Sequence, residues 1–556
     1  MRSFVSVHNA LMRHCAAALL CLCASLASAS DFGWEPDIKP GKRYPAHMGF
    51  AAVHVVDNFE LRFPDFKSWT GLTVKRTDKF GRSYNLEGNM AGLSSGQVFA
   101  GALPAGDYQV QRVWYGDAYR PPSLESLGVR FRVERGRFTD VGSVAVNVVA
   151  NARRKHYVVV TTDAIALAWS ASNPGLLGWL HAVHPELSAI GPASVRYDVS
   201  EKAFVSANAP QPSIQRQTPV LLYSATGLPH LTDDGTTVFP ARFGSLRIRS
   251  PQGQWGLVDT GLTVNLNAVA EYEGRLVIGG DRGTLRVQSG EDWQPIVGVG
   301  PDESVYAMRA TAGGLWVLAG GPAQAVLYQV DIAHRSLRQH KIFGKRDGYR
   351  PLKRQRLSLL QRSFLPGELG QGRPSGIDAV RPAILVDNEN LLVGLGERRW
   401  ALESGSKWST YQEEVDLATA ILQPNGRLIG LYDGHSNRGN FFVSSDGRSW
   451  RRLPGYRTYD GFPYAFSDGA IGAIVPDRAG ARGNQPVGNL KVAFEIRRDA
   501  DVVARPLPPA CRRLLGTAST DELLLIECRD LTVLRSVDRG QTWHVDWRLP
   551  AAETES

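Results

Sequence analysis

One group of side chains in the C-terminal half combines the functional groups that ligand recognition requires. It occupies two segments, 433–440 and 456–460, which hold Asp433, His435, Asn437, Arg438 and Asn440, followed by Tyr456, Arg457, Tyr459 and Asp460. Aromatic rings beside carboxylate, amide and guanidinium groups provide a stacking platform and oriented hydrogen bonds, as sugar or peptide recognition requires. The alternative is loop packing, in which the tyrosines cover a rim and the polar groups satisfy turns.

Carboxylates in the same half of the chain also suit hydrolytic chemistry. Asp281, Asp433, Asp460 and Asp468 are candidates for the paired acids of a glycoside hydrolase, if they approach one central face. The separation of two such carboxylates decides the mechanism, and a sequence does not supply it. A glycosidase is therefore retained as an alternative function.

A basic segment, 344–381, is a third candidate site. Its charges are Lys345, Arg346, Arg350, Lys353, Arg354, Arg356 and Arg362. Such a run suits phosphate or sulfate groups of a polyanion, but few aromatic residues interleave with the charges, and a solvated loop is the simpler interpretation.

Metal and cofactor chemistry has little support in the sequence. His181 and His184 lie three residues apart beside Glu186, but without a third ligand elsewhere the two histidines are interpreted as surface or packed residues. There is no Gly-rich phosphate loop ending in Lys-Ser or Lys-Thr, no H-E-x-x-H, no cysteine cluster, and no G-x-S-x-G elbow between a strand and a helix. We expect no metal and no cofactor.

A repeat organises the elements that must position these residues. The segment 243–250 followed by Trp255 superposes on the segment 282–289 followed by Trp293, and the same ending recurs at Trp408, Trp450 and Trp543. Two further blades without the Trp are centred on 315–330 and 471–496. The repeats and their spacing predict a seven-bladed β-propeller of four-stranded blades. Residues 195–207 are a candidate for an extra pair of strands or the closing strand.

The last repeat carries a complete turn motif, S-x-D-x-G-x-T-W. Its residues are Ser536, Asp538, Gly540, Thr542 and Trp543. The motif resembles the Asp box, or BNR repeat, of sialidase-like β-propellers, and in that family the box is structural. No R-I-P turn occurs, and no arginine triad is identified, so no catalytic role is transferred. The blades also resemble Ycf48-like propellers, which implies a non-enzymatic assembly or scaffold role.

Propellers with such boxes place the turn between the third and fourth strands on one face. The loops between the second and third strands then lie on the opposite face, with the connections between blades. This topology assigns five loops to one face, namely Arg242 with Phe243, Asp281 with Arg282, Glu397 with Arg398, 433–440, and Arg529 with Asp530. We expect the basic segment and the cluster at 433–460 to decorate that face.

The N-terminal part alternates with period two, which predicts a β-sandwich over residues 30–160. Its strands are expected near 51–56, 72–76, 108–114, 129–133 and 141–149. The phrase Leu103-Pro104-Ala105-Gly106-Asp107-Tyr108 resembles a turn of transthyretin-like accessory modules, with its Tyr packed inward. Residues 161–215 are interpreted as a connector with one helix over 174–187, capped by Asn173.

The chain ends suggest export. Arg2, Arg13 and an apolar run from Cys15 to Leu26 precede an A-x-A site, so residues 1–29 are predicted to be a signal peptide. Three of five cysteines leave with it, and Cys511 and Cys528 are predicted to form a disulfide between two strands of the last blade. The propeller is expected to span 216–550, with a disordered tail at 551–556.

These observations predict an all-β, exported protein, periplasmic or secreted. Its expected role is non-enzymatic binding of a glycan or an extracytoplasmic protein through the face that bears the insertions, with a polyanion as a further candidate. The formal charge of +9 is too modest to favour nucleic acid, and no later segment is apolar enough to insert in a membrane.

Overall fold

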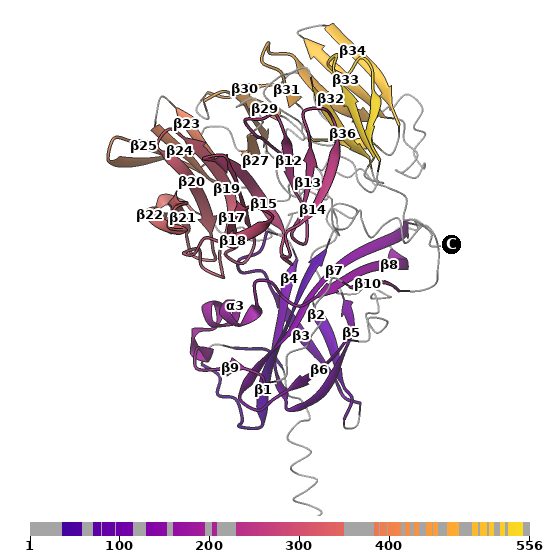
Figure 1. Ribbon diagram of the computed structural model, residues 1–556, viewed down its shortest axis with the longest axis vertical. Helices are drawn as coiled ribbons and strands as arrows, with labels where there is room; N and C mark the ends of the chain where they lie inside the picture. Colours follow the sequence, from indigo (N-terminus) through magenta and orange to yellow (C-terminus); the bar gives the residue numbers. More distant parts are fainter. Residues whose placement is uncertain are drawn as a thin grey trace, which may run out of the picture.

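A computed structural model describes most of the chain between residues 36 and 548. The segments inside those limits that it does not describe are 40, 58–70, 79–80, 95, 115–128, 153–159, 195–202, 208–228, 350–382, 388–389, 397–398, 413–416, 423–426, 433–440, 447–448, 454–463, 477–491, 499–500, 509–510, 516–522 and 529–531. The described residues form an N-terminal β-sheet module and a propeller that lies beside it (Figure 1).

The N-terminal module is built on one sheet of ten strands. They are β1 (Met48–Asp57), β2 (Gly71–Arg76), β3 (Ser83–Asn89), β4 (Gln97–Pro104), β5 (Gly106–Trp114), β6 (Arg130–Val133), β7 (Arg137–Ala152), β8 (Val160–Ser170), β9 (Gly191–Pro192) and β10 (Ala203–Ala207). The order across the sheet is β10-β8-β7-β1-β4-β3-β2-β5-β6, with β9 paired to β7. The strand β1 is parallel to β7 and antiparallel to β4.

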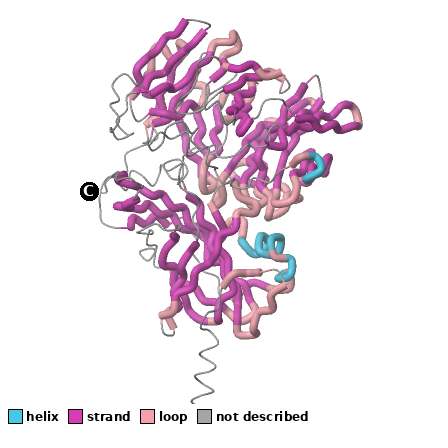
Figure 2. The backbone as a smooth tube through the Cα atoms, turned by 180° about the vertical axis from the view of Figure 1, so that it is seen from behind, coloured by secondary structure: helices cyan, strands magenta, loops and turns pink. Residues whose placement is uncertain are grey.

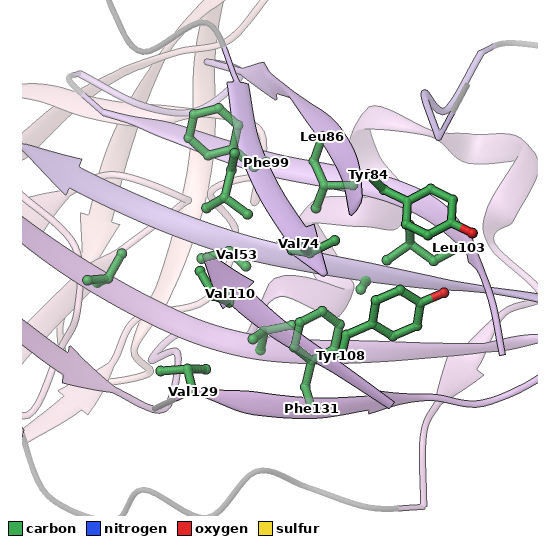
Figure 3. Close-up of a cluster of buried hydrophobic side chains, with 14 of the residues drawn as sticks. Val53, Val74, Tyr84, Leu86, Phe99, Leu103, Tyr108, Val110, Val129 and Phe131 are labelled. Carbon is green, nitrogen blue, oxygen red and sulfur yellow. The ribbon is translucent and has the colours of Figure 1, made fainter. Parts of the chain in front are cut away.

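This sheet curls on itself instead of forming the predicted sandwich of two sheets. The turn between β6 and β7 returns to the start of β1, where Gly136 N donates to Met48 O at 2.8 Å. A single core on the inner side then takes side chains from β1 through β7, among them Val53, Phe99 and Tyr108 (Figure 3). Period-two alternation is the same in a curled sheet and in a sandwich, so the sequence did not distinguish them.

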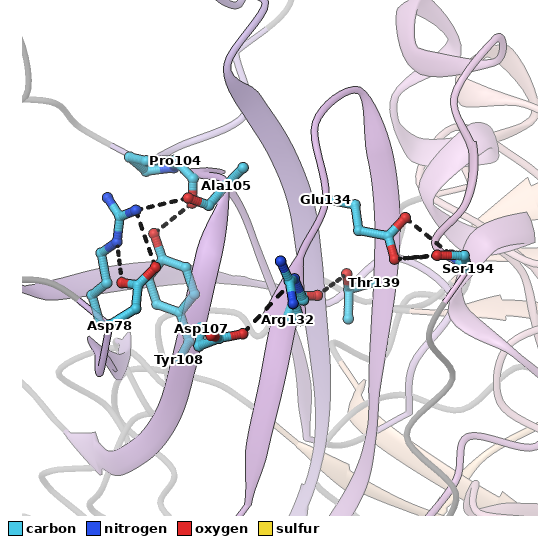
Figure 4. Close-up of polar contacts among 10 residues, drawn as sticks. Asp78, Pro104, Ala105, Asp107, Tyr108, Arg132, Glu134, Thr139 and Ser194 are labelled. Atoms are coloured by element: carbon cyan, nitrogen blue, oxygen red, sulfur yellow. Dashed lines mark hydrogen bonds and ion pairs between the residues drawn. The ribbon is translucent and has the colours of Figure 1, made fainter.

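The phrase 103–108 forms the turn between β4 and β5. Tyr108 is buried and stacks on Phe131, with ring centroids 5.6 Å apart, as predicted for an inward Tyr. Its hydroxyl donates to Pro104 O at 2.7 Å, which ties the strand back to the turn that precedes it (Figure 4). Arg76 braces the same turn by donating to Ala105 O at 2.8 Å. The buried phenol is therefore hydrogen-bonded, as burial of a polar group requires.

The segment predicted as a connector contributes to the N-terminal module. Two of its strands, β8 and β10, belong to the ten-stranded sheet, and β10 pairs with β8 rather than with any blade. The helix is shorter than predicted, since α3 (Leu176–Val183) is followed by the 3-10 turn η2 (Pro185–Leu187). In both Figure 1 and Figure 2 this helix lies against the outer side of the sheet. There Leu176, Trp179 and Leu180 pack against Phe50 and Phe138.

Seven four-stranded sheets confirm the predicted blade count. Blades 1 to 3 comprise β11 (His230–Leu231), β12 (Thr237–Pro240), β13 (Ser245–Arg249) and β14 (Trp255–Asp259); β15 (Leu266–Tyr272), β16 (Arg275–Gly280), β17 (Leu285–Ser289) and β18 (Asp292–Pro295); and β19 (Ser304–Thr311), β20 (Gly314–Gly320), β21 (Ala325–Asp331) and β22 (Ser336–Phe343). Blades 4 and 5 comprise β23 (Ala383–Asp387), β24 (Asn390–Gly396), β25 (Arg399–Ser404) and β26 (Lys407–Gln412); and β27 (Leu417–Leu422), β28 (Leu428–Tyr432), β29 (Phe441–Ser444) and β30 (Arg451–Arg452). Blades 6 and 7 comprise β31 (Tyr464–Ala465), β32 (Ile471–Pro476), β33 (Val492–Arg498) and β34 (Asp501–Leu507); and β35 (Cys511–Leu514), β36 (Leu524–Cys528), β37 (Val533–Ser536) and β38 (His544–Trp547).

Each blade is made of four consecutive strands, so blades 7 and 1 share no strand. Side chains therefore close the ring between these two blades. Trp255 stacks between Phe239 and Trp547, with ring centroids 5.5 and 5.4 Å apart. The buried Arg247 guanidinium lies over these rings and pairs with Glu527 of blade 7. Closure therefore depends on aromatic packing and a buried ion pair rather than on a shared strand.

The predicted disulfide is present inside blade 7. Cys511 of β35 and Cys528 of β36 are directly opposed in the antiparallel register and are joined by an S–S bond. The bond spans a sequence separation of 17 residues. It links the two inner strands of the blade that meets blade 1. Within the described residues, no helix is both long and apolar enough to cross a membrane.

Candidate functional site

The loops that the sequence assigned to one face have the same backbone turn in blades 1 and 2. Between the second and third strands, Phe243 has φ of 51° and Gly244 has φ of 71°, and in the next blade Arg282 and Gly283 have φ of 54° and 67°. A left-handed residue other than glycine is uncommon, so the turn is a specific feature of both loops. This shared turn explains why the two sequence repeats superpose.

The N-terminal module covers these loops through Asp281. The Asp281 carboxylate accepts hydrogen bonds from Ser94 N at 2.8 Å and Ser94 Oγ at 3.1 Å, both on the loop between β3 and β4. It also accepts from Asn267 Nδ2 at 2.9 Å, Ser304 Oγ at 2.7 Å and Asn265 Nδ2 at 3.3 Å within the propeller. Burial raises the pKa of Asp281, although the hydrogen bonds from Asn267 and Ser304 lower it. The side chain is fully enclosed and joins the two parts of the molecule.

A second carboxylate, the half-buried Asp140, organises the module's side of this contact. Asp140 Oδ2 accepts from Leu176 N at 2.8 Å, so a residue of β7 caps the first turn of α3. Asp140 Oδ1 accepts from Ser172 Oγ at 2.9 Å and Gly142 N at 3.0 Å. Burial raises the pKa of Asp140, and these hydrogen bonds and the charge of Arg282 oppose the increase.

Arg282 is the buried cation near both carboxylates. Its backbone N donates to Gly92 O at 2.7 Å, which adds a second link between propeller and module. Its Nε and both Nη atoms have no hydrogen-bond partner among the residues that the structure describes. Burial lowers the pKa of Arg282 to about 10, while the charges of Asp140 and Asp281 oppose that decrease. The Arg282 guanidinium therefore attracts Asp140 and Asp281 through its charge and not through hydrogen bonds, because other protein donors already occupy the carboxylate oxygens.

The nearby His54 and Ser143 do not form a catalytic triad. His54 Nδ1 lies 3.3 Å from Ser143 Oγ, and Ser143 Oγ lies 3.2 Å from Ser172 Oγ. Asp140 bonds to Ser172 and not to the imidazole, so among the residues that the structure describes no carboxylate orients the histidine as a triad requires. Burial, with Arg282 nearby, lowers the pKa of His54 well below its usual value, so the ring is neutral. Because His54 and Ser143 are fully enclosed, this chain of polar groups has no access to a substrate.

Asn173 attaches the helix segment to the propeller. It was predicted to cap the helix, but its backbone N donates to Thr263 Oγ1 at 2.9 Å and its Nδ2 to Gly261 O at 3.0 Å. Both acceptors lie in the connection between blades 1 and 2. Thr263 Oγ1 also donates to Ser143 Oγ at 3.0 Å. We call the set Ser94, Asp140, Ser143, Asn173, Thr263, Asp281 and Arg282 the joint.

The predicted ligand-binding cluster lies outside the described residues. Asp433, His435, Asn437, Arg438, Asn440, Tyr456, Arg457, Tyr459 and Asp460 fall in 433–440 and 454–463. These segments join β28 to β29 and β30 to β31 of blades 5 and 6. Their assignment to a common face remains a prediction.

The basic segment is described only at its start. Lys345 and Arg346 are exposed in the 3-10 turn η3 (Lys345–Asp347), while Arg350, Lys353, Arg354, Arg356 and Arg362 lie outside the described residues. Tyr349 fixes the turn to blade 3 by donating to Gly321 O at 2.9 Å. The described part is a solvated turn between blades 3 and 4, where the insertion was predicted.

The turn 536–543 lies between β37 and β38 and is held by its own polar groups. Asp538 accepts from Ser536 Oγ at 2.6 Å and Thr542 Oγ1 at 2.6 Å, and Gly540 N donates to Ser536 Oγ at 2.6 Å. Although desolvation opposes it, these hydrogen bonds lower the pKa of Asp538 to about 2. Trp543 packs edge-on against Phe494 of blade 6, with ring centroids 5.3 Å apart.

Asp468 lies beside this turn and not with Asp281. It belongs to the turn between β31 and β32 and accepts from Arg539 Nη1 at 2.6 Å. The expectation that Asp281 and Asp468 approach one central face is therefore wrong. Alternate turns of an up-and-down blade lie on opposite faces, so the first turn of blade 6 lies on the face opposite Asp281.

The two helix histidines are engaged by protein groups. His181 Nε2 lies 2.9 Å from Ile190 O, and His184 Nδ1 lies 3.5 Å from Glu186 Oε1. Among the described residues, no group of three or more His, Cys, Asp or Glu side chains is placed to hold a metal ion.

The sequence interpretation missed the joint, for which two signals exist. His54 interrupts an apolar strand, and Asn265 and Asn267 stand just before the apolar run of β15. Buried polar residues at such positions require partners. Asn265 and Asn267 donate to Asp281, and Asp281 in turn accepts from Ser94 of the N-terminal module.

Comparisons with known proteins return only weak structural likenesses. No family model matches the chain, and no curated protein does. Among solved structures, Ycf48 bound to a D1 peptide has 15% identity and a TM-score of 0.32, over 51% of this chain and 81% of that chain. The WD40 propeller domain of Doa1 has 15% identity and a TM-score of 0.32, over 56% and 91%. Regucalcin, a calcium-binding protein from Agrobacterium tumefaciens, has 11% identity and a TM-score of 0.29, over 47% and 84%. Likenesses this weak carry no argument about function.

Proposed function

We propose that this chain is an exported, non-catalytic binding protein that presents its propeller to a protein partner. The observation that carries the proposal is the placement of the described carboxylates offered for hydrolysis. Asp281 is enclosed in the joint with its oxygens occupied, and Asp468 lies on the opposite face in an ion pair with Arg539. Neither forms a pair with the other, which argues against a two-carboxylate hydrolase centred on these residues.

The joint also supports a binding role, because it makes the molecule a firm platform. The N-terminal module occupies the loops of blades 1 and 2, at Asp281, Arg282 and Thr263. The segments 433–440 and 454–463 belong to blades 5 and 6, away from the joint around the ring. We propose that these loops, with Asp433 and Tyr459 among their residues, form the partner site on the part of this face that the module leaves uncovered.

A protein partner is favoured over a glycan by the character of the described surface. Its exposed large apolar side chains are Leu257, Val297, Ile342, Val502, Val503, Val537 and Val545. Exposed apolar side chains gathered on a surface mark protein contacts. The proposal of export rests on the signal-like segment 1–29 and on the disulfide between Cys511 and Cys528, which suits an oxidising compartment. The turn 536–543 is proposed to be an Asp box with a structural role.

Hydrolysis and binding assays test this function together. We expect no turnover of a panel of sialosides and polysaccharides by the intact protein. Turnover that Asp433→Ala or Asp460→Ala abolishes, and that the exposed Asp292→Ala leaves unchanged, would overturn the non-catalytic proposal. Binding to immobilised peptides is expected, and binding to a glycan array alone would replace the protein partner by a glycan.

Export has its own test. The full chain is expressed in a bacterium, fractionated, and the N-terminus of the mature protein is determined. We expect the mature chain to begin after Ala29 and to lie outside the cytoplasm. A cytoplasmic protein that retains residues 1–29 would contradict export while leaving the binding proposal intact.

A further inference from the structure

Exposed apolar side chains gather at the outer rim of blades 6 and 7. Among the described residues, four of the seven exposed large apolar side chains lie there: Val502 at 47%, Val503 at 42%, Val537 at 61% and Val545 at 49% exposure. Two of them, Val502 and Val503, belong to the outermost strand of blade 6. In that strand, β34, only the last of seven residues is buried.

Strand register determines which of these valines faces the space between the two blades. Directly opposed residues of an antiparallel pair project from the same side of a sheet. Val503 is opposite Ile496, and Arg505 is opposite Phe494. Ile496 and Phe494 pack in the core between blades 6 and 7. Val503 and Arg505 therefore extend that layer outward on the side of blade 7, and Val502 projects from the other side.

Blade 7 contributes to the same layer from across the gap. Val545 of β38 is opposite Leu534, which belongs to the core between blades 6 and 7. Trp543 packs against Phe494 further in. We call Val503, Arg505, Trp543 and Val545 the blade 6–7 rim.

Other blade contacts fill this position with large rings. Between blades 7 and 1, Trp547 of the outer strand stacks on Trp255 at 5.4 Å. Between blades 3 and 4, His340 of the outer strand meets Trp408 at 6.0 Å. In blade 6 the outer strand supplies Val503 and Arg505 instead, and both are exposed to solvent. The blade 6–7 rim thus keeps an apolar surface that the other two contacts bury.

Two properties of β34 indicate what covers this surface. The strand is the last of its sheet, so one edge of its backbone is unpaired within the described sheet and suits addition of an extended segment. Arg505 is exposed and has no ion-pair partner among the described residues, so its charge is open to an acidic group. An added strand would meet Val503 and Arg505 two residues apart on the same side, since side chains alternate along a strand.

We propose that the blade 6–7 rim binds an extended peptide of a partner protein that has an apolar and an acidic side chain two positions apart. The peptide pairs with the edge of β34, places its apolar side chain against Val503 and Val545, and places its carboxylate at Arg505. This inference rests on the proposed protein-binding function but assigns a surface separate from the loops at 433–460.

An array of ten-residue peptides tests the rim. The peptides contain Val or Ile two positions before or after Asp or Glu, and a matched array has Lys at the acidic positions. Fluorescence polarisation with the full chain is expected to select acidic over Lys peptides. Val503→Asp and Val545→Asp should each weaken binding at least tenfold, and Arg505→Glu should reverse the preference toward Lys peptides.

Val502→Asp is the matched control, because it places the same change on the same strand facing the other side. It should alter binding less than threefold. Peptide binding that Val503→Asp and Val545→Asp leave unchanged would overturn the rim while sparing the proposed function. Equal loss in Val502→Asp and Val503→Asp would also overturn the assigned side. If no peptide of either array binds, the proposed peptide site at the rim is overturned. A loss of partner binding in the Asp433→Ala protein would then show that the proposed function holds without a peptide site at the rim.

Discussion

Buried histidines show how single residues in this molecule are tuned by their surroundings. His230 of blade 1 accepts a hydrogen bond from Glu271 N at 2.9 Å, so its Nε2 must stay unprotonated. Burial and then the charge of Arg309 lower the pKa of His230 to about 4, and Asp233 opposes them. The imidazole thus links two neighbouring blades only in its neutral form.

We predict that His230 makes stability depend on pH between about 6.5 and 4. The unfolded chain binds a proton in this window and the folded chain does not, so stability is complete above pH 6.5 and decreases as the pH falls. The decrease is on the order of 3 kcal/mol, given about 1.4 kcal/mol per unit of pKa. Urea denaturation at pH 7 and pH 4.5 measures it.

His230→Gln keeps an acceptor that does not titrate, so its stability should change less between these two pH values. His334→Gln, in an exposed turn, is the matched control and should titrate like the native protein. Equal pH dependence in the native protein and His230→Gln would contradict the prediction.

At the scale of elements, the propeller depends on how its first and last blades meet. The consecutive blades share chain connections, but blades 7 and 1 are joined by Trp547, Trp255 and Phe239, by Arg247 with Glu527, and by Arg249 with Asp546 at 2.7 Å. Asp546 also accepts from Trp255 Nε1 at 2.9 Å. On the side of blade 7, the polar closure is therefore made by side chains of its outer strand β38 and its second strand β36.

Trp547→Ala should loosen this closure specifically. Loss of a large ring from a packed contact costs about 3 kcal/mol, and it leaves the Arg247 charge less covered. Hydrogen exchange should increase in β12–β14 and in β35–β38. Trp293→Ala removes a similar ring between blades 1 and 2, and its increase should stay local to those blades. Exchange spread evenly over all blades in Trp547→Ala would refute the closure role.

The disulfide reinforces the same blade. Replacing both Cys511 and Cys528 by Ser should lower the free energy of unfolding by about 3 kcal/mol, because the unfolded chain loses a closed loop of this size. Guanidinium denaturation with and without reductant measures the difference. Reductant should destabilise the native protein and leave the double variant unchanged. A variant as stable as the oxidised protein would show that the bond contributes nothing.

At the scale of the whole molecule, the joint determines whether the module and the propeller act as one body. Asp281 receives five hydrogen bonds, two of them from Ser94 of the module. Its charge also lies near the buried guanidinium of Arg282, which has no hydrogen-bond partner among the described residues. Removing one partner of a buried charge pair is strongly destabilising, since the other charge remains in a medium that solvates it poorly.

Asp281→Ala should therefore lower stability by about 3 to 5 kcal/mol and free the module from the propeller. Limited proteolysis should then cleave between the two parts, and small-angle scattering should show a larger radius of gyration. Asp292→Ala, an exposed carboxylate of the same blade, should change neither. An Asp281→Ala protein that remains compact and protease-resistant would show that the joint is held by other contacts.

Sequence reasoning was strongest where a local pattern repeats. The Trp endings and the turn at Ser536 predicted seven blades, and the opposed positions of Cys511 and Cys528 predicted a bond that is present. It was weakest where distant segments meet. The curled sheet, the pairing of β10 with β8, and the capping of α3 by Asp140 all depend on contacts far apart in the chain.

The candidate site divides in the same way. Asp281 and Arg282 were assigned correctly to a loop between second and third strands, but their enclosure by Ser94 and Gly92 follows from docking of the module. The sequence pattern of blade 2 does not indicate that Asp281 contacts Ser94, which lies 187 residues earlier in the chain. The residues at 433–460 remain a prediction.

The side-chain closure between blades 1 and 7 has a consequence for synthesis. A ribosome releases the chain from its N-terminal end, so blade 1 emerges with Arg247, Trp255 and Phe239 long before Glu527, Asp546 and Trp547 exist. Six blades can assemble as an open arc, but the Arg247 charge stays exposed until β36 and β38 arrive. The arrival of β38 is then the event that seals the ring, and a chain interrupted before residue 544 would display an unsealed aromatic and cationic edge.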